Sequence, residues 1–195
     1  MSRYQRVRIV SRSFIIRHCK TEESWDNLPY DQLIKLIRQE TDPDLDMPFL
    51  KEQLDISKVK KLKLNSIYSS PSKRAVQTAR AISSIINVPV RIIPELQEIR
   101  FDTIPKDIYL AGKEEIRSFL FNKTVKSYAD LKIKKIFSLL DDNVLVITHG
   151  FLMRIIYSRL FNVDINSLIK NKLFTNYLSG FECMSGKGVS LLKEG

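Results

Sequence analysis

Two residues that could do chemistry stand out in the sequence, because the chain contains only two histidines. His18 and His149 each follow a short apolar run, and Arg17 directly precedes the first of them. A neutral imidazole can act as a nucleophile or exchange protons near neutral pH, and a neighbouring guanidinium favours its neutral form. A single histidine at the end of a strand is more often a buried, hydrogen-bonded residue. Two such histidines and an adjacent arginine instead suggest a site for an anionic substrate.

The elements before these histidines decide whether they can meet. Ser13–Ile16 and Val144–Ile147 are short apolar runs of the kind found in strands that are buried on both faces. Helical patterns alternate with such strands along the chain, which predicts an α/β fold: a three-layer sandwich with a mostly parallel sheet and helices on both faces. Ligands bind to such sheets outside the carboxyl ends of the strands. We therefore expect His18 and His149 to lie in one cleft.

The other expected elements follow from apolar periodicity and turn signals. Ser70 and Pro71 suit the N-cap and the first position of a helix that should end near Asn87. The remaining expectations are a helix over 48–64, strands over 66–68 and 88–93, a loop over 94–105, helices over 106–122, 127–140 and 151–161, and a closing hairpin over 173–184 and 188–192. We expect residues 1–195 to form a single domain, and the residues around 99–130 could form a small helical cap.

Composition limits the function classes. The 195 residues are 44% apolar, and 32 Lys and Arg against 22 Asp and Glu give a net charge of +10, which attracts anionic partners. The two cysteines lie far apart and suggest neither a disulfide framework nor a zinc site. No stretch approaches the roughly 18 apolar residues of a membrane span. We therefore expect a cytoplasmic protein that does not associate with membranes; the oligomeric state is left open.

Four segments together carry a family resemblance. RHCKT at 17–21 is similar to an RHGxT signature, and SPSKRAVQTA at 70–79 closely resembles SPxxRAxQTA. LQE at 96–98 with Phe101 resembles an acidic L-x-E…F segment, and VITHG at 146–150 resembles V-[ST]-H-G. In this order and spacing, over residues 12 to 155, the chain resembles the histidine phosphatase superfamily, the phosphoglycerate-mutase-like phosphatases.

The resemblance implies phosphoryl transfer in two steps, without a metal or another cofactor. His18 would attack phosphorus and form a phosphohistidine, which water then hydrolyses. Guanidinium groups can bind phosphate oxygens through two parallel hydrogen bonds, as this chemistry requires. The resemblance implies that four residues bind the phosphoryl oxygens: Arg17, Thr21, Arg74 and His149.

The leaving oxygen also needs a proton. The resemblance assigns this role to Glu98, which would require a raised pKa. Glu95 is the nearest alternative carboxyl, although a solvated loop residue is the more ordinary interpretation of it. Only 51 positions separate Glu98 from His149, which favours a phosphatase over a mutase, because the family's mutases carry long insertions there. The substrate would be a phosphorylated metabolite or phosphoprotein, and Lys20, Arg100 or Lys106 could contact its remaining charge.

The chain departs from the family pattern beside the nucleophile. Cys19 stands where the family usually has glycine, so we expect its side chain either to narrow the phosphate pocket or to require another backbone conformation. This substitution leaves open a catalytically impaired member that only binds phosphorylated ligands. Trp25 sits one residue late for the family's W-N pair. It also argues against a cysteine-dependent phosphatase, because the H-C-x5-R pattern requires arginine at that position.

A basic nucleic-acid-binding module is the alternative from another class. It rests on the net charge and on two lysine-rich runs, VKKLK at 59–63 and KIKK at 132–135. Apolar residues interrupt both runs at helical spacing. We therefore expect two amphipathic helix surfaces and no nucleic-acid partner.

Overall fold

The sheet of this fold has six strands. The computed structural model of the chain describes residues 12–22, 28–127, 130–140, 143–174, 176–184 and 189–192. Among these residues the strand order is β3-β2-β4-β1-β5-β6; the first four strands in this order are parallel, β5 runs antiparallel to β1, and β6 runs antiparallel to β5. The sheet is therefore mostly parallel, as expected. The strands are β1 (Arg12–Arg17), β2 (Ser66–Ser69), β3 (Val90–Ile92), β4 (Val144–Thr148), β5 (Gly180–Met184) and β6 (Val189–Leu192).

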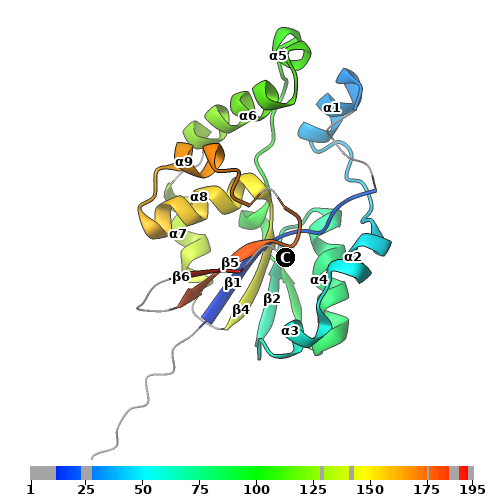
Figure 1. Cartoon of the computed structure of the whole chain (residues 1–195), viewed down its shortest axis with the longest axis vertical. Coiled ribbons are helices and arrows are strands. Elements are labelled where there is room, and N and C mark those ends of the chain that lie inside the picture. Colours follow the sequence, from blue (N-terminus) through cyan, green and yellow to red (C-terminus); the bar gives the residue numbers. More distant parts are fainter. Residues whose placement is uncertain are drawn as a thin grey trace, which may run out of the picture.

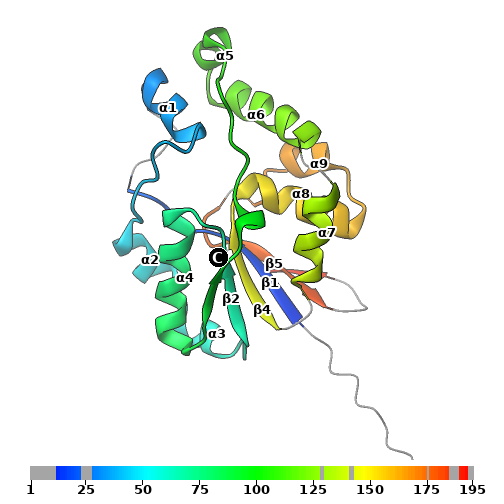
Figure 2. The same ribbon diagram turned by 180° about the vertical axis from the view of Figure 1, so that it is seen from behind.

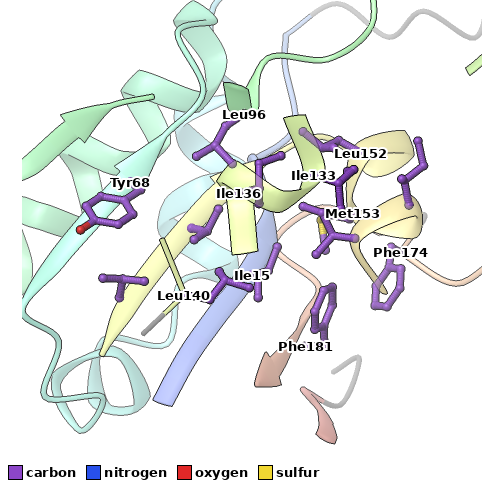
Figure 3. Close-up of a cluster of buried hydrophobic side chains, with 14 residues drawn as sticks. Ile15, Tyr68, Leu96, Ile133, Ile136, Leu140, Leu152, Met153, Phe174 and Phe181 are labelled. Carbon is purple, nitrogen blue, oxygen red and sulfur yellow. The ribbon is translucent and has the colours of Figure 1, made fainter. Parts of the chain in front are cut away.

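Helices cover both faces of this sheet (Figure 1; Figure 2), which confirms the three-layer sandwich. Successive side chains of a strand point to opposite faces, and β1 shows the result. Phe14 and Ile16 join the core beneath α4, whereas Ile15 joins the core beneath α7 and α8. Figure 3 shows this second core, in which side chains from the strands meet Ile136 of α7 and Met153 of α8.

The helices differ from the expectation in number and in bounds. The expected helix over 48–64 is wrong: it is two short helices, because Leu54 is extended and Asp55 caps the second one through the backbone N–H of Lys58. Two helices were not expected, α1 and α9. The helices are α1 (Tyr30–Ile37), α2 (Met47–Gln53), α3 (Ile56–Lys60), α4 (Lys73–Ile86), the 3-10 helix η2 (Pro94–Leu96), α5 (Lys106–Ala111), α6 (Lys113–Ser127), α7 (Asp130–Ser138), α8 (Gly150–Phe161) and α9 (Ile165–Lys170).

The start of α4 is a second correction. The helix begins at Lys73 with Ser72 at its N-cap, so Ser70 and Pro71 precede it rather than start it. The Ser70 hydroxyl instead lies 2.8 Å from His149. The predicted end is confirmed, because Asn87 adopts the left-handed conformation that commonly closes a helix.

Three helices stand beyond the carboxyl ends of the parallel strands (Figure 1; Figure 2). The expected helix over 106–122 is divided at Gly112, whose φ of 108° interrupts the helix and separates α5 from α6. Both helices pack with α1 around a separate apolar cluster. The buried members of this cluster are Leu33, Ile34, Ile104, Ile116 and Leu120.

The closing hairpin is shorter than expected. Only residues from Gly180 onward form its first strand, which pairs with β1 and β6. A Cβ atom at Gly180 would lie 2.0 Å from the carbonyl oxygen of Ile15, so this close approach of β5 to β1 requires glycine. The described residues between α9 and β5 form turns, with Phe174 and Leu178 both at φ 59°. No helix in the described ranges is long and apolar enough to cross a membrane.

Candidate active site

The two histidines meet as expected. β1 and β4 are adjacent and parallel, so His18 and His149 leave the sheet at the same edge, with ring centroids 5.1 Å apart. A cavity of about 210 Å³ opens there. All six residues predicted for the site line it: Arg17, His18, Thr21, Arg74, Glu98 and His149.

Hydrogen bonds assign the proton on the His18 ring. Its Nδ1 lies 2.6 Å from the carbonyl oxygen of Cys19, which only accepts, so Nδ1 carries the hydrogen. Its Nε2 lies 3.2 Å from Nε of Arg74, and a guanidinium only donates. Burial, followed by the charges of Arg74 and Arg17, holds the pKa of His18 well below its ordinary value. His18 is therefore a neutral imidazole whose Nε2 lone pair faces a cationic group.

Arg74 lies between the two imidazoles. Its Nε reaches His18, its Nη2 lies 3.4 Å from Nδ1 of His149, and its Nη1 donates to Asp42 at 2.7 Å. Asp42 also accepts from the backbone N–H of Lys73 in the first turn of α4. The carboxylate therefore joins the guanidinium to the start of its own helix. Sequence reasoning missed Asp42, which lies in a polar loop with no motif around it.

His149 is held from its other side by Ser70. Because Arg74 donates toward Nδ1, the ring hydrogen lies on Nε2 and is donated to the Ser70 hydroxyl at 2.8 Å. Burial, with the nearby charge of Arg74, holds the pKa of His149 well below its ordinary value. Ser70 belongs to the recognised SP segment, but its role is ring orientation rather than helix capping.

Arg17 packs over an aromatic ring. Its guanidinium carbon lies 4.1 Å from the ring centroid of Tyr177, and the same ring lies 5.9 Å from that of His18. A cation–π contact of this kind restrains the position of a guanidinium. Tyr177 comes from the turns before β5. No sequence signal identified it, since its position depends on how β5 pairs with β1.

Glu98 is a partly buried carboxyl that contacts the start of α8. Its oxygens accept from the backbone N–H groups of Phe151 at 3.1 Å and Ile99 at 3.3 Å. Burial nevertheless raises its pKa above the ordinary value. Glu95, the alternative, does not line the cavity and forms an ion pair with Lys135. Of these two carboxyls, Glu98 lines the cavity and Glu95 does not.

Cys19 does not narrow the pocket, which corrects the first of our two expectations for it. Its side chain is fully buried in a small apolar cluster with Leu45 and Leu50, and it is not among the cavity-lining residues. Its backbone N–H donates to the Thr78 hydroxyl at 3.0 Å. The next residue along the chain that lines the cavity is Thr21. It is buried and forms an isolated antiparallel β-bridge with Leu45. Trp25 lies outside the described residues.

A further correction concerns the charged residues that were expected to contact the rest of the substrate. Lys20, Arg100 and Lys106 do not line the cavity, and Lys20 forms an ion pair with Asp46 at 3.2 Å. Arg117 and Arg154 line it instead. These two arginines come from α6 and α8, and no motif that we recognised includes either.

The cavity extends away from the histidines along an apolar wall. Helices α1 and α6 supply much of this wall, and the loop before α5 and the start of α8 add to it. The apolar lining includes Leu33, Ile37, Phe101, Leu120, Phe121 and Phe151. Among the residues that the structure describes, no group of three or more His, Cys, Asp or Glu side chains could hold a metal ion.

Comparison with known proteins agrees with this arrangement. Residues 13–193 match the family model of the histidine phosphatase superfamily (branch 1). A solved structure of a putative α-ribazole-5′-P phosphatase from Escherichia coli superposes with a TM-score of 0.64 at 18% identity, covering 93% of this chain and 94% of the other. No curated protein matches the chain in sequence.

Two further solved structures share the fold at similarly low sequence identity. A mycobacterial glucosyl-3-phosphoglycerate phosphatase complexed with VO3 has a TM-score of 0.63 at 15% identity, over 94% of this chain and 98% of that one. An Entamoeba histolytica phosphoserine phosphatase complexed with 3-phosphoglyceric acid has a TM-score of 0.63 at 18% identity, over 94% and 95%. At these identities the likeness shows the fold alone.

Proposed function

Because the chain belongs to the histidine phosphatase superfamily, we propose that it is a phosphomonoesterase acting on a phosphorylated metabolite or phosphoprotein through a phosphohistidine at His18. One observation carries the proposal: the unprotonated Nε2 of His18 faces the Arg74 guanidinium inside a cavity. This nitrogen can attack phosphorus only as the free base, and the guanidinium marks where phosphoryl oxygens would bind. The proposal requires no metal or cofactor.

The first step forms a bond between Nε2 of His18 and phosphorus and breaks the phosphorus–oxygen ester bond. Negative charge on the phosphoryl oxygens is met by Arg17, Arg74 and the Thr21 hydroxyl, held in place before the reaction. A phosphoryl dianion beside His149 would favour its protonated form and make it a further donor. The leaving oxygen takes its proton from Glu98, because burial raises the pKa of this carboxyl and so favours its protonated form.

The second step returns the enzyme to its starting state. Water attacks the phosphorus of the phosphohistidine, the nitrogen–phosphorus bond breaks, and inorganic phosphate leaves. Glu98, now a carboxylate, accepts the proton from that water and so regains the proton it gave away. We propose hydrolysis rather than transfer to a second substrate, because only a short segment separates Glu98 from His149.

The proposal is tested by hydrolysis of p-nitrophenyl phosphate in EDTA over about pH 5 to 8. We expect chelator-resistant turnover that His18→Ala abolishes, and an acid-labile phosphoenzyme after rapid quenching of the intact protein. The matched control is Ser138→Ala, an exposed serine on α7 that does not line the cavity. Turnover that survives His18→Ala, or that EDTA abolishes, would contradict the mechanism.

The two alternatives find no supporting observation. A catalytically impaired member was suggested by Cys19, whose thiol lies in the core rather than in the cavity. The lysine-rich runs are amphipathic surfaces, as expected. Val59 and Ile133 pack into the two cores, and Lys135 pairs with Glu95. Binding of vanadate without turnover would revive the first alternative, and salt-sensitive RNA binding would revive the second.

A further inference from the structure

Arg154 is a charged residue in the cavity that the proposed mechanism does not use. It lies on α8, one turn after Gly150, and lines the same cavity as the histidines. Only 9% of the residue is exposed. Removing a guanidinium from water costs several kcal/mol unless an anion compensates it, so its partners need to be identified.

The described residues provide Arg154 with no compensating anion. Its Nη1 donates to the backbone carbonyl of Gly150 at 3.2 Å, and a neutral carbonyl does not balance a charge. Its buried Nε has no hydrogen-bond partner among the described residues, and none of their carboxylates forms an ion pair with it. Glu98 is the carboxyl that acts on it electrostatically, and our mechanism needs that group protonated when substrate binds.

The other charged groups that act on Arg154 are cations, and Glu114, a second carboxylate that lines the cavity, is paired with Arg117 at 3.0 Å. A methyl group at Gly150 would lie 3.5 Å from Nη1 of Arg154 and 3.6 Å from Nε of Arg17, so the two guanidiniums approach the same glycine. Arg117 of α6 also lines the cavity and repels both of them. Burial, followed by the charge of Arg17, lowers the pKa of Arg154 to about 10. This part of the cavity therefore favours an added negative charge.

The phosphoryl group has cationic donors of its own. In the proposed mechanism it lies against His18 and is bound by Arg17 and Arg74, and the mechanism does not need Arg154 of α8 for it. The cavity continues from the histidines along the apolar wall of α1 and α6, which can accommodate an organic group. A substrate extending along this wall could bring a second acidic group to Arg154.

We infer that Arg154 binds a second oxyanion of the substrate, so that the natural substrate is a phosphomonoester whose organic part carries a carboxylate or a second phosphate. The inference rests on the proposed function, because it takes the phosphoryl site at His18 as given. A guanidinium presents a planar fork of donors to either oxyanion.

Non-hydrolysable phosphonates test this inference without any catalytic step. Binding of phenylphosphonate, its meta- and para-carboxylated derivatives and 1,4-benzenediphosphonate would be measured by titration calorimetry. We expect at least one doubly acidic compound to bind the intact protein about tenfold or more tightly than phenylphosphonate. The carboxylates and the diphosphonate distinguish the two kinds of oxyanion.

The variants connect this preference to one side chain. Arg154→Met keeps length and apolar contact but removes the charge, and we expect the preference to fall to within about twofold. Arg154→Lys keeps the charge but loses the fork, and should retain only part of the preference. The matched control is Arg159→Met, which removes the same charge from an exposed position on the same helix. It should leave the ratio unchanged.

Each outcome decides between the two proposals. If all the phosphonates bind equally, the second oxyanion site is wrong and the phosphoryl site stands. If none binds, both proposals are overturned. If Arg154→Met still prefers the doubly acidic compounds, Arg154 does not bind the second oxyanion. If Arg154→Met does not fold, an unreduced preference in Arg154→Lys leads to the same conclusion. If Arg154 only supported Glu98 as a proton donor, replacing Arg154 would leave the ratio of the binding affinities unchanged, because phosphonate binding transfers no proton.

Discussion

At the scale of single residues, the proposed chemistry depends on which ring nitrogen carries hydrogen. The carbonyl of Cys19 fixes that hydrogen on Nδ1 of His18, and Arg74 donates toward the opposite nitrogen. A positive charge beside a nucleophilic nitrogen has two effects that support each other. It disfavours protonation of the imidazole, and it attracts the phosphoryl group that the imidazole is to attack.

Replacing Glu98 with glutamine removes the proposed proton donor but keeps its size. We expect kcat/KM to fall by about 10²-fold or more for phenyl phosphate, and much less for p-nitrophenyl phosphate, because nitrophenolate leaves without protonation. The measurement is the ratio of the two kcat/KM values in the variant and in the intact protein, because kcat/KM reports phosphoryl transfer to His18 and not the later attack of water.

The control for this prediction is Glu95→Gln, which removes a nearby carboxylate that does not line the cavity. This variant should leave the ratio unchanged. An equal loss with both substrates in Glu98→Gln would mean that Glu98 does not supply the leaving-group proton.

The sequence identified the residues that belong to motifs, but not those that depend on loops. His18 and His149 could be brought together because a parallel sheet places the ends of its strands at one edge. Tyr177 and Arg154 line the cavity from turns with left-handed residues and from a helix interior, and Asp42 contacts Arg74 from a polar loop. Their side chains have no local pattern that separates them from solvated or core residues.

At the scale of elements, the loop before α2 holds the first turns of α4. Asp42 contacts Arg74 and the backbone of Lys73, while Asp44 contacts the side chains of Lys73 and Gln77, each at 2.7 Å. The two carboxylates thus hold the same helix, but only Asp42 touches a proposed phosphate-binding side chain.

These neighbouring aspartates provide a matched pair of variants. We expect Asp42→Ala to lower kcat/KM for p-nitrophenyl phosphate by about tenfold, because Arg74 loses a charge-assisted hydrogen bond that orients it. Asp44→Ala should leave kcat/KM within about twofold, since exposed ion pairs contribute little. Equal losses in the two variants would show that the loop acts through helix stability rather than through Arg74.

Gly112 joins α5 to α6, which we propose form with α1 a small cap over the cavity. Its φ of 108° is unfavourable for any residue with a side chain, yet a Cβ atom there would have no neighbour within 4 Å. Gly112→Ala should therefore lower the free energy of unfolding by about 1 to 3 kcal/mol through backbone strain alone. Urea denaturation would measure this change.

The control is Ala111→Gly at the end of α5, which removes a methyl group and should cost about 1 kcal/mol or less. An unchanged midpoint in Gly112→Ala would mean that the junction relaxes freely. The sequence predicted a continuous helix here because the apolar spacing on either side is compatible with one. A single glycine ended it, as Leu54 ended the expected helix over 48–64.

At the scale of the whole molecule, which we propose is one domain, the buried histidines make stability depend on pH. The pKa values of His18 and His149 lie well below the ordinary value of about 6.5 in the folded protein. Below that pH the unfolded chain binds protons that the folded chain does not. Stability is therefore lost as the pH falls, by about 1.4 kcal/mol per pH unit for each histidine.

Glu98 has the opposite effect on the pH dependence of stability, because its pKa is raised in the folded state. It destabilises the fold above that pKa, and acidification removes the cost. We expect net destabilisation between pH 7 and 5.5, measured by urea unfolding, since two histidines oppose one carboxyl. His18→Gln should reduce the pH slope, whereas Glu98→Gln should steepen it. The sign assignment fails if both variants change the slope in the same direction.

The burial of Cys19 has a consequence for how this activity would respond to oxidants. Peroxide attacks thiolates, and burial raises the pKa of Cys19 to about 11 and that of Cys183 to about 12. No cysteine lines the described cavity, where the proposed nucleophile is a ring nitrogen. Oxidative stress that silences phosphatases dependent on a reactive thiol should leave this one working, so that dephosphorylation by this protein would continue while theirs stops.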